Sequence, residues 1–201
     1  DPVNPIEIGQ YTDDITLFKV VDDILYLCSP SGQLSIIDFT DALNPQEIGS
    51  YSISSQASSL KIEEGIAYIG ISNHGIDIID LSDNTNPSLI GHYESGSGLY
   101  SYTFGIQDKL IYLIDDQETE MIFVDVLTPE NPRELGSVSL FQNPPSNTIY
   151  YDVFIQNSLA VLTMDNNQVS GFFFDYEDTD GDGLKNFEET ILLTDSLEPD
   201  S

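Results

Sequence analysis

Residues 41–82 read DALNPQEIGSYSISSQASSLKIEEGIAYIGISNHGIDIIDLS, and this stretch decides the fold because most of the chain repeats it. Its Asn-Pro pair recurs at steps of 40, 42 and 45 residues, at Asn4, Asn44, Asn86 and Asn131. Four positions after each proline stands a glycine that follows an aliphatic residue: Gly9, Gly49, Gly91 and Gly136. Self-similarity at a period of this length indicates a repeat architecture.

Each unit predicts four short β-strands. In the second unit we expect strands at 46–51, 58–62, 66–72 and 76–81, with tight turns at 63–65 and 73–75. The β-branched and aromatic runs between Gly, Asn and Asp residues are typical of strands and hairpins. Runs such as ILYL and IAYIGI are apolar at consecutive positions, which predicts burial of both sheet faces. We therefore predict an all-β fold, a β-propeller of four four-stranded blades over residues 1–177.

The repeat units are out of phase with the chain ends. The chain opens with a strand that follows Asn-Pro (6–11), and the fourth unit offers three strands of its own (149–155, 158–163 and 171–176). If the strand after Asn-Pro is the outermost of a blade, the N-terminal strand could complete the fourth blade and close the ring, which hides an exposed edge. Two alternatives are strand donation to a neighbouring molecule, giving a filament, and a chain that is one piece of a larger ring.

The units resemble the LVIVD repeats of bacterial and archaeal surface proteins. The resemblance rests on Asn-Pro-x-x-Ile-Gly-x-Tyr at Asn4, Asn44 and Asn86, and on GIDIIDLS at residues 75–82. It covers residues 1–177 and is weakest in the fourth unit, where Val138 replaces the tyrosine and FFFDY replaces IIDLS. The resemblance implies a propeller on an exported protein, and it supplies no catalytic residues.

Charge and composition exclude several partners. The 201 residues include 35 acidic and five basic side chains, a formal net charge of −30. Nucleic acids and anionic membrane surfaces need clustered Lys and Arg, so neither is an expected partner. The sequence has no apolar run long enough to cross a bilayer, no signal peptide and no initiator methionine, so we expect a processed protein or a fragment without direct membrane insertion. The charge suits a secreted or surface protein in saline surroundings, where salt screens self-repulsion.

Residues 178–189, DTDGDGLKNFEE, match a twelve-position calcium loop. Asp178, Asp180 and Asp182 stand at positions one, three and five, and Gly183 stands at six, where the chain must turn sharply. Leu184 offers its carbonyl at seven, Asn186 stands at nine, and Glu189 at twelve can bind bidentately. We therefore predict a Ca²⁺ site, followed by a short helix over 184–193 and separate from the propeller as an appendage of residues 178–201.

A strand rather than a helix precedes this loop, so it is not an EF-hand. The segment resembles the thrombospondin type 3-like calcium repeats of bacterial exported proteins, in which a Thr-Asp-x-x-x-Pro-Asp stretch follows the loop. That resemblance implies Asp195 as a further ligand and Asp200 as a candidate, although the pattern stops at Ser201. An extracellular site of this kind binds calcium weakly, with a Kd of about 10⁻⁴–10⁻³ M.

The strand-end aspartates and the loops of one rim are less specific candidates for a functional site. An aspartate ends one strand of each unit (Asp38, Asp80, Asp125 and Asp175), and we expect it to accept backbone hydrogen bonds rather than to form a ring of carboxylates. The turns at 29–32, 73–75, 115–118 and 165–168 should share one rim with the loops at 52–58, 94–100 and 141–148. A glycan, peptide or cation could bind there, although the neighbouring tyrosines (Tyr100, Tyr102, Tyr150 and Tyr151) are expected mainly to fill space between blades.

The remaining reactive side chains are few. Cys28 is the only cysteine and is expected to be a small buried hydrophobe. His74 and His92 are the only histidines, and neither has a nearby cysteine or serine motif that indicates zinc or a catalytic triad.

These observations predict a non-enzymatic, calcium-binding propeller that acts as a structural, adhesive or interaction module at the cell surface or in an extracellular assembly. Its partners would be calcium and either itself, another surface protein or a glycan. Two alternatives are a calcium-dependent hydrolase or lyase with a site on the propeller rim, and a filament subunit joined by strand donation.

Overall fold

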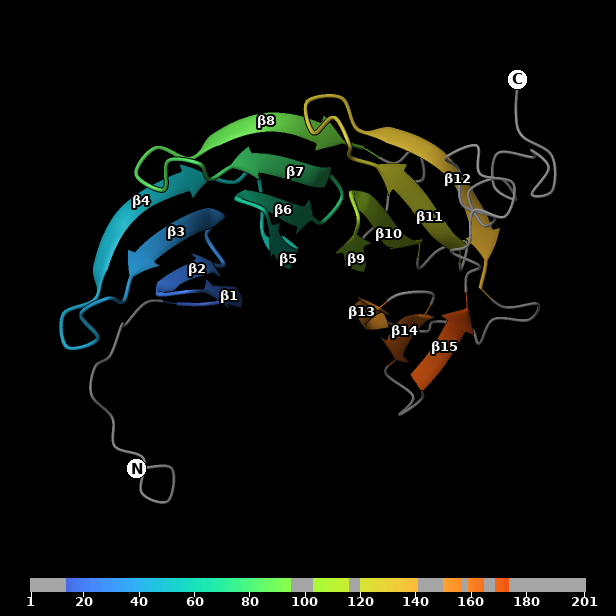
Figure 1. The fold of residues 1–201 in the computed structure, drawn as a ribbon, viewed down its shortest axis with the longest axis horizontal. Helices are drawn as coiled ribbons and strands as arrows, with labels where there is room; N and C mark the ends of the chain where they lie inside the picture. Colours follow the sequence, from blue (N-terminus) through green and yellow to red (C-terminus); the bar gives the residue numbers. More distant parts are fainter. Residues whose placement is uncertain are drawn as a thin grey trace, which may run out of the picture.

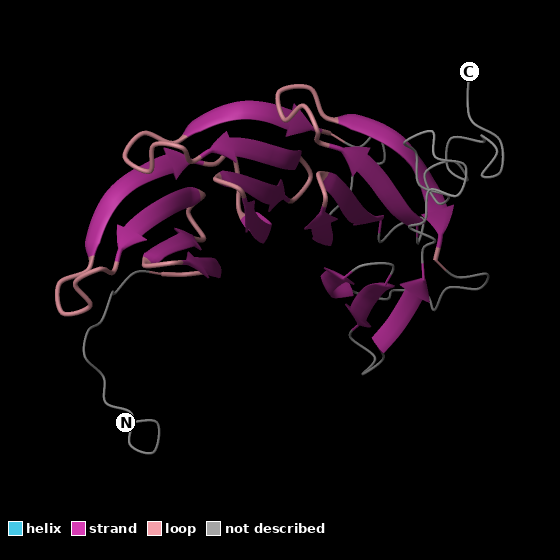
Figure 2. Ribbon diagram, in the orientation of Figure 1, coloured by secondary structure: helices cyan, strands magenta, loops and turns pink. Residues whose placement is uncertain are grey.

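The computed structural model describes residues 14–94, 103–115, 120–140, 150–156, 159–164 and 169–173. These segments form fifteen β-strands joined by turns, and they contain no helix that could span a membrane. The strands make four antiparallel sheets, three of four strands and one of three, which follow one another along an arc (Figures 1 and 2). The predicted all-β, propeller-like series of sheets is confirmed.

Each sheet takes its strands from one continuous part of the chain, in sequence order. The first sheet contains β1 (Leu17–Val21), β2 (Ile24–Cys28), β3 (Gln33–Asp38) and β4 (Gln46–Ser52). The second contains β5 (Ala57–Glu63), β6 (Ile66–Ile71), β7 (Gly75–Asp80) and β8 (Ser88–Tyr93). The third contains β9 (Thr103–Gln107), β10 (Leu110–Asp115), β11 (Glu120–Asp125) and β12 (Arg133–Ser139). The fourth contains β13 (Tyr150–Gln156), β14 (Leu159–Met164) and β15 (Val169–Phe173).

The phase of the repeat agrees with the prediction. The strands that follow an Asn-Pro pair, β4, β8 and β12, each lie at the outer edge of a sheet and pair with the preceding strand of the same unit. The fourth sheet has three described strands, the number that its own unit was expected to supply. Residues 6–11 lie outside the described residues, so closure of the ring by that strand stays a prediction.

The turns of the second unit also agree with the prediction. Glu63 pairs with Ile66, which leaves Glu64 and Gly65 as a two-residue hairpin loop. Both loop residues have positive φ, of 49° and 74°. Two consecutive positive φ values are typical of a type I′ turn, whose twist matches that of the strands it joins.

In the described residues, the aliphatic residue and glycine that follow each Asn-Pro pair form a β-bulge. Ile36 pairs with Gly49 and Ile37 pairs with Glu47, so the residue between Glu47 and Gly49 is left unpaired. The same register shift skips one residue before Gly91 in β8 and one before Gly136 in β12. A bulge bends and twists the strand that carries it, which curves the outer edge of these three sheets.

The glycine of the bulge also makes room for the next sheet. A Cβ atom on Gly49 would lie 2.0 Å from the carbonyl oxygen of Asn84, and one on Gly91 would lie 1.9 Å from that of Pro129. Both oxygens belong to the turn before the outer strand of the following unit. The repeated glycine is therefore required by the close approach of consecutive sheets.

The hydrophobic core lies between the sheets. One apolar cluster joins the first and second sheets, a second joins the second and third, and a third joins the third and fourth. Tyr68, Phe104, Tyr112 and Phe123 are among the largest fully buried side chains. Strands β6 and β7 are buried along most of their length, which confirms the two-sided burial expected from their continuous apolar runs. The inner strands β1, β5, β9 and β13 contact one another in chain order.

Candidate functional site

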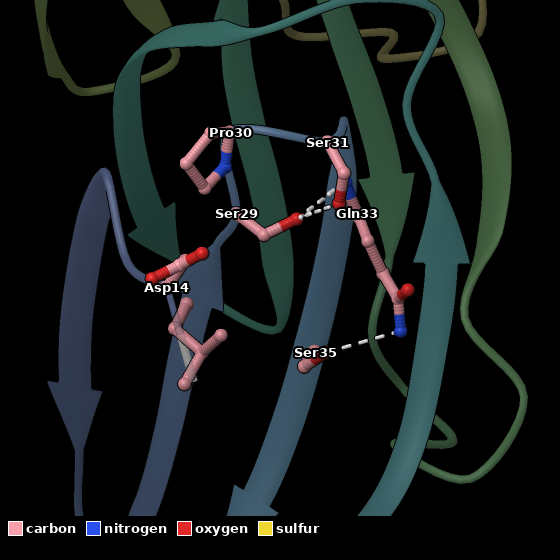
Figure 3. Close-up of a pocket in the computed structure, with 7 residues that line it drawn as sticks. Asp14, Ser29, Pro30, Ser31, Gln33 and Ser35 are labelled. Atoms are coloured by element: carbon pink, nitrogen blue, oxygen red, sulfur yellow. Dashed lines mark hydrogen bonds between the residues drawn. The ribbon is translucent and has the colours of Figure 1, made fainter. Parts of the chain in front are cut away.

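A polar pocket of about 290 Å³ lies on the first sheet, beside the turn between β2 and β3 (Figure 3). It is lined by Asp14, Leu27, Ser29, Pro30, Ser31, Gln33 and Ser35. The turn is closed by a hydrogen bond from the Gly32 amide to the Ser29 carbonyl, of 3.1 Å. This turn is the first of those expected to form a rim.

The pocket holds a connected set of hydrogen-bonding groups. The hydroxyls of Ser29 and Ser31 lie 2.7 Å apart, and the Gln33 amide nitrogen Nε2 donates to the Ser35 hydroxyl at 3.2 Å. Hydroxyls both donate and accept, and the amide carbonyl of Gln33 can accept from a ligand. The lining offers three serine hydroxyls, the Gln33 amide and the Asp14 carboxylate, a set of donors and acceptors that suits a polar ligand.

A second cavity of about 230 Å³ lies beside the inner strands and is lined in part by Lys19 and Lys61. These lysines occupy equivalent positions in β1 and β5, opposite Tyr26 and Tyr68 respectively. Lys61 Nζ lies 2.8 Å from Asp152 Oδ1 on β13, so its charge is paired with a carboxylate of the fourth sheet. This ion pair connects the second sheet to the fourth near the centre of the arc.

The two histidines of the chain meet at a single buried aspartate. Asp77 on β7 is 5% exposed and pairs in register with His92 on β8. Asp77 Oδ1 lies 2.8 Å from His92 Nδ1 and 3.9 Å from His74 Nε2, and the two imidazole rings lie 4.6 Å apart. Burial, and secondarily the charge of Asp77, raise the pKa of Tyr51 on β4. The cluster therefore lies where the first and second sheets meet.

This cluster was not predicted from the sequence, because only cysteine and serine motifs were considered as partners of the two histidines. His74 and His92 are separated by 18 positions, and Asp77 stands inside an apolar run. The signal that could have found it is the hairpin register, since Asp77 of IDIID and His92 of IGHY face each other once the two strands are paired. Two imidazoles and a carboxylate with ligand atoms within 4.8 Å of one another are able to hold a metal ion.

The aspartates at strand ends have the structural role that was predicted. Asp38, Asp80 and Asp125 each accept a hydrogen bond, of 2.8 Å, from the backbone amide two residues later. This hydrogen bond lowers the pKa of Asp38. Three repeats thus use the carboxylate to fix the turn after the strand. Asp175 lies outside the described residues.

A carboxylate without a hydrogen-bond partner lies beside the second cavity. Glu63 Oε2 is buried and has no such partner among the described residues. Desolvation raises the pKa of Glu63, and the nearby Lys109 opposes that rise. Lys109 itself forms an ion pair with Glu64. The group lies at the junction between the second and third sheets.

Cys28 is fully buried, as predicted, and forms no disulfide. Desolvation raises its pKa to about 12, so the side chain remains a thiol at neutral pH. Of the four tyrosines expected near the rim, Tyr151 on β13 is 65% exposed. Tyr100 and Tyr102 lie outside the described residues.

The predicted calcium site lies outside the described residues, which end at residue 173. This applies to the ligands Asp178, Asp180, Asp182, Leu184, Asn186, Glu189, Asp195 and Asp200, and to the expected helix at 184–193. Calcium binding therefore stays a prediction from the sequence.

A comparison with known protein families agrees with the division of the chain into units of one sheet each. An LVIVD repeat is found at residues 54–95, a range that contains the whole second sheet from β5 to β8. A search of curated proteins found no match.

Solved structures share the fold at low sequence identity. The computationally designed Ika4 protein matches with a TM-score of 0.61 and 12% identity, over 85% of this chain and 99% of that chain. The computationally designed Ika8 protein matches with a TM-score of 0.60 and 12% identity, over 83% of this chain and 48% of that chain. At this identity the likeness concerns the fold alone.

Proposed function

We propose that this protein is a non-enzymatic interaction module, exported to the cell surface or to an extracellular assembly, that binds a neutral polar ligand such as a glycan on its first sheet. The observation that carries the proposal is the pocket of Figure 3, which is lined by three serine hydroxyls, the Gln33 amide and the Asp14 carboxylate. Sugar hydroxyls match such a set of donors and acceptors. The net charge of −30 repels polyanionic ligands, which favours a neutral one.

The two cavities described above lie at the lower end of the size range of small-molecule sites. Small-molecule sites are usually clefts of about 300–1,000 Å³ with a few converging polar groups. The pocket of Figure 3 measures about 290 Å³, and the cavity beside the inner strands about 230 Å³. Small, shallow sites of this kind suit weak recognition of one sugar or side chain within a larger partner.

A binding assay with neutral oligosaccharides tests the proposal. Screening of immobilised glycans should give binding that is lost in Gln33→Ala, which removes the amide from the pocket. Gln46→Ala is the matched control, because Gln46 is exposed on β4 and bonds only to the carbonyls of its own turn. Equal binding by the parent and Gln33→Ala would place recognition elsewhere, and turnover of a glycan would favour the enzymatic alternative.

We further propose that the ring closes through the first and fourth sheets. Phe18 and Val20 on β1 are 67% and 55% exposed, whereas the residues equivalent to Phe18 are at most 8% exposed: Leu60, Phe104 and Val153. The buried ones pack against the preceding sheet, and the first sheet has no preceding sheet in the arc. The N-terminal strand would then complete the fourth sheet, either within the chain or in a neighbouring copy.

Deletion of residues 1–11 tests closure. If the ring closes within one chain, the deletion should lower the Tm and leave a monomer by light scattering. If strands are exchanged, the full-length protein should form concentration-dependent oligomers that the deletion abolishes. A deletion variant as stable as the parent, with both monomeric, would contradict both forms of the proposal.

Calcium binding by residues 178–201 completes the proposal. The order and spacing of the oxygen ligands from Asp178 to Glu189 support it. Calcium that binds only the folded form stabilises it, so addition of EDTA should lower the Tm or speed proteolysis of the tail. An Asp180→Ala/Glu189→Ala variant should no longer respond to EDTA, and an unchanged response in that variant would contradict the assignment.

A further inference from the structure

We propose that His74, Asp77 and His92 form a binding site for one divalent transition-metal ion, such as Zn²⁺. The site lies in the second sheet, at its junction with the first, and it is independent of the calcium loop and of the polar pocket in Figure 3. The proposal rests on donor chemistry, geometry and the way Asp77 and His92 depart from the repeat.

The donor set distinguishes this site from a calcium site. Imidazole nitrogen suits zinc, copper, iron and nickel, whereas calcium takes oxygen ligands alone. Two histidines and one carboxylate also form the ligand set of catalytic zinc sites and non-haem iron centres, in which other coordination positions remain open. The side chains of His74 and His92 are 45% and 31% exposed, so water or a partner's side chain can reach the remaining positions.

The distances fit a shared ion with small adjustments. Two ligand atoms bound at about 2.1 Å to one zinc lie about 3.0–3.4 Å apart, depending on the coordination geometry. Asp77 Oδ1 lies 2.8 Å from His92 Nδ1, slightly below this range, and 3.9 Å from His74 Nε2, about 0.5 Å above it. All three ligand atoms lie within 4.8 Å of one another. The exposed ring of His74 can rotate to close the longer distance. The ion takes the place of the proton between Asp77 and His92.

The backbone holds these residues in place. Asp77 and His92 are directly paired residues of β7 and β8, and the His74 amide donates to the Ile71 carbonyl at 3.0 Å within the turn. Gly75 has a φ of 128°, and a Cβ atom there would lie 2.0 Å from the Tyr93 carbonyl oxygen and 3.0 Å from His92 Cε1. Glycine is therefore required by the close approach of β8, and its lack of a side chain also leaves space beside the His92 ring.

Asp77 and His92 break the repeat, whereas residues with a structural role recur in it. The strand pairings place Ser35 opposite Ser50 in the first sheet and Ile122 opposite Ser137 in the third, at the positions where the second sheet has Asp77 opposite His92. The fold therefore forms without an acid and a histidine at this point. A buried carboxylate is costly unless it is paired, and a role specific to this unit accounts for its presence.

Titration of the untagged protein with Zn²⁺ in calcium-saturated buffer tests the proposal, because calcium occupies the acidic sites that compete for cations. Calorimetry should show one zinc per chain. The two histidines give two sets of imidazole signals in a ¹H–¹⁵N spectrum, and both sets should shift together and saturate at one equivalent. Co²⁺ should give the visible absorption of a nitrogen-ligated ion.

Three variants separate this site from adventitious binding. His74→Gln and His92→Gln change an exposed and a half-buried side chain, and each should weaken zinc binding by at least the roughly 10–100-fold that follows loss of a supporting residue. Asp77→Asn keeps the shape and should do the same, while Glu130→Gln, which removes an exposed carboxylate elsewhere, should bind as the parent does. Absence of zinc binding, a shift of only one histidine, or equal affinity in the His74→Gln/His92→Gln double variant would overturn the proposal.

Discussion

Replacement of Gly91 with alanine tests whether the repeated glycine serves the approach of consecutive sheets. A Cβ atom at this position would lie 1.9 Å from the carbonyl oxygen of Pro129 and 2.9 Å from the carbonyl carbon. Real Cβ atoms essentially never come within 3.0 Å of another heavy atom, so β8 and the turn at Pro129 must separate by about 1.1 Å. The obstacle is backbone, and no change of rotamer relieves it.

The expected cost follows from that displacement. Overpacking typically costs about 1–3 kcal/mol, and a gap of about 0.5–1 Å already forfeits a quarter to a half of the dispersion energy of the contacts it separates. The second and third sheets share an apolar cluster that includes the fully buried Tyr68 and Phe104. We therefore expect a loss of about 3 kcal/mol in the free energy of unfolding, and a Tm lower by about 6–12 °C for a domain of this size.

Urea unfolding followed by far-UV circular dichroism measures this loss, since the chain has no tryptophan to report by fluorescence. Gly49→Ala should behave alike, because its Cβ would lie 2.0 Å from the Asn84 carbonyl oxygen. Gly171→Ala is the matched control, with its nearest atom the flexible Leu159 Cδ1 at 3.3 Å, and should change stability by less than about 0.5 kcal/mol. If Gly91→Ala unfolds at the same urea concentration as Gly171→Ala, the steric account of the repeat glycine is wrong.

Three further predictions concern polar groups between the sheets. Burial raises the pKa of Glu63, so the folded state prefers the protonated form of this side chain. The stability that this preference contributes is present at pH values below the pKa of Glu63 in the unfolded chain. It is lost as the pH rises through the pKa of Glu63 in the folded chain. Glu63→Gln should therefore raise the Tm at about pH 8 and have little effect at about pH 4, and a pH-independent difference would contradict this. Tyr26→Phe removes the hydrogen bond of 3.1 Å from the Tyr26 hydroxyl to Asn84 Oδ1, which links two sheets, and should cost about 0.5–1.5 kcal/mol in urea unfolding; no loss would show the bond is not maintained. Lys61→Met should lower the free energy of unfolding by less than about 1 kcal/mol, because the ion pair with Asp152 is partly exposed, and this loss should be smaller in high salt. A larger loss that does not depend on salt would mean that the packing of the lysine methylene groups matters rather than the charge.

The fold could be predicted from the sequence because its determinants recur. The Asn-Pro pairs and apolar runs gave the number, order and phase of the sheets, since each unit independently supports the same strands. The sequence also showed that a glycine follows each aliphatic residue, but not the reason for it. That reason is a carbonyl oxygen of the next unit, Asn84 for Gly49 and Pro129 for Gly91, and a contact between units has no signal within either one.

Asp77 and Asp80 stand three positions apart in β7, but only the role of Asp80 could be predicted from the sequence. Asp80 could be assigned a structural role from the sequence because Asp38 and Asp125 recur at its position, and its hydrogen bond to the Ser82 amide agrees with that assignment. Asp77 has no counterpart in the other units. Its chemical role depends on which residue of β8 lies opposite it. A shift of one residue in that register would turn His92 to the other face of the sheet. In a repeat protein, recurrence therefore predicts what holds the fold, whereas residues that break recurrence need a strand register before their chemistry can be inferred.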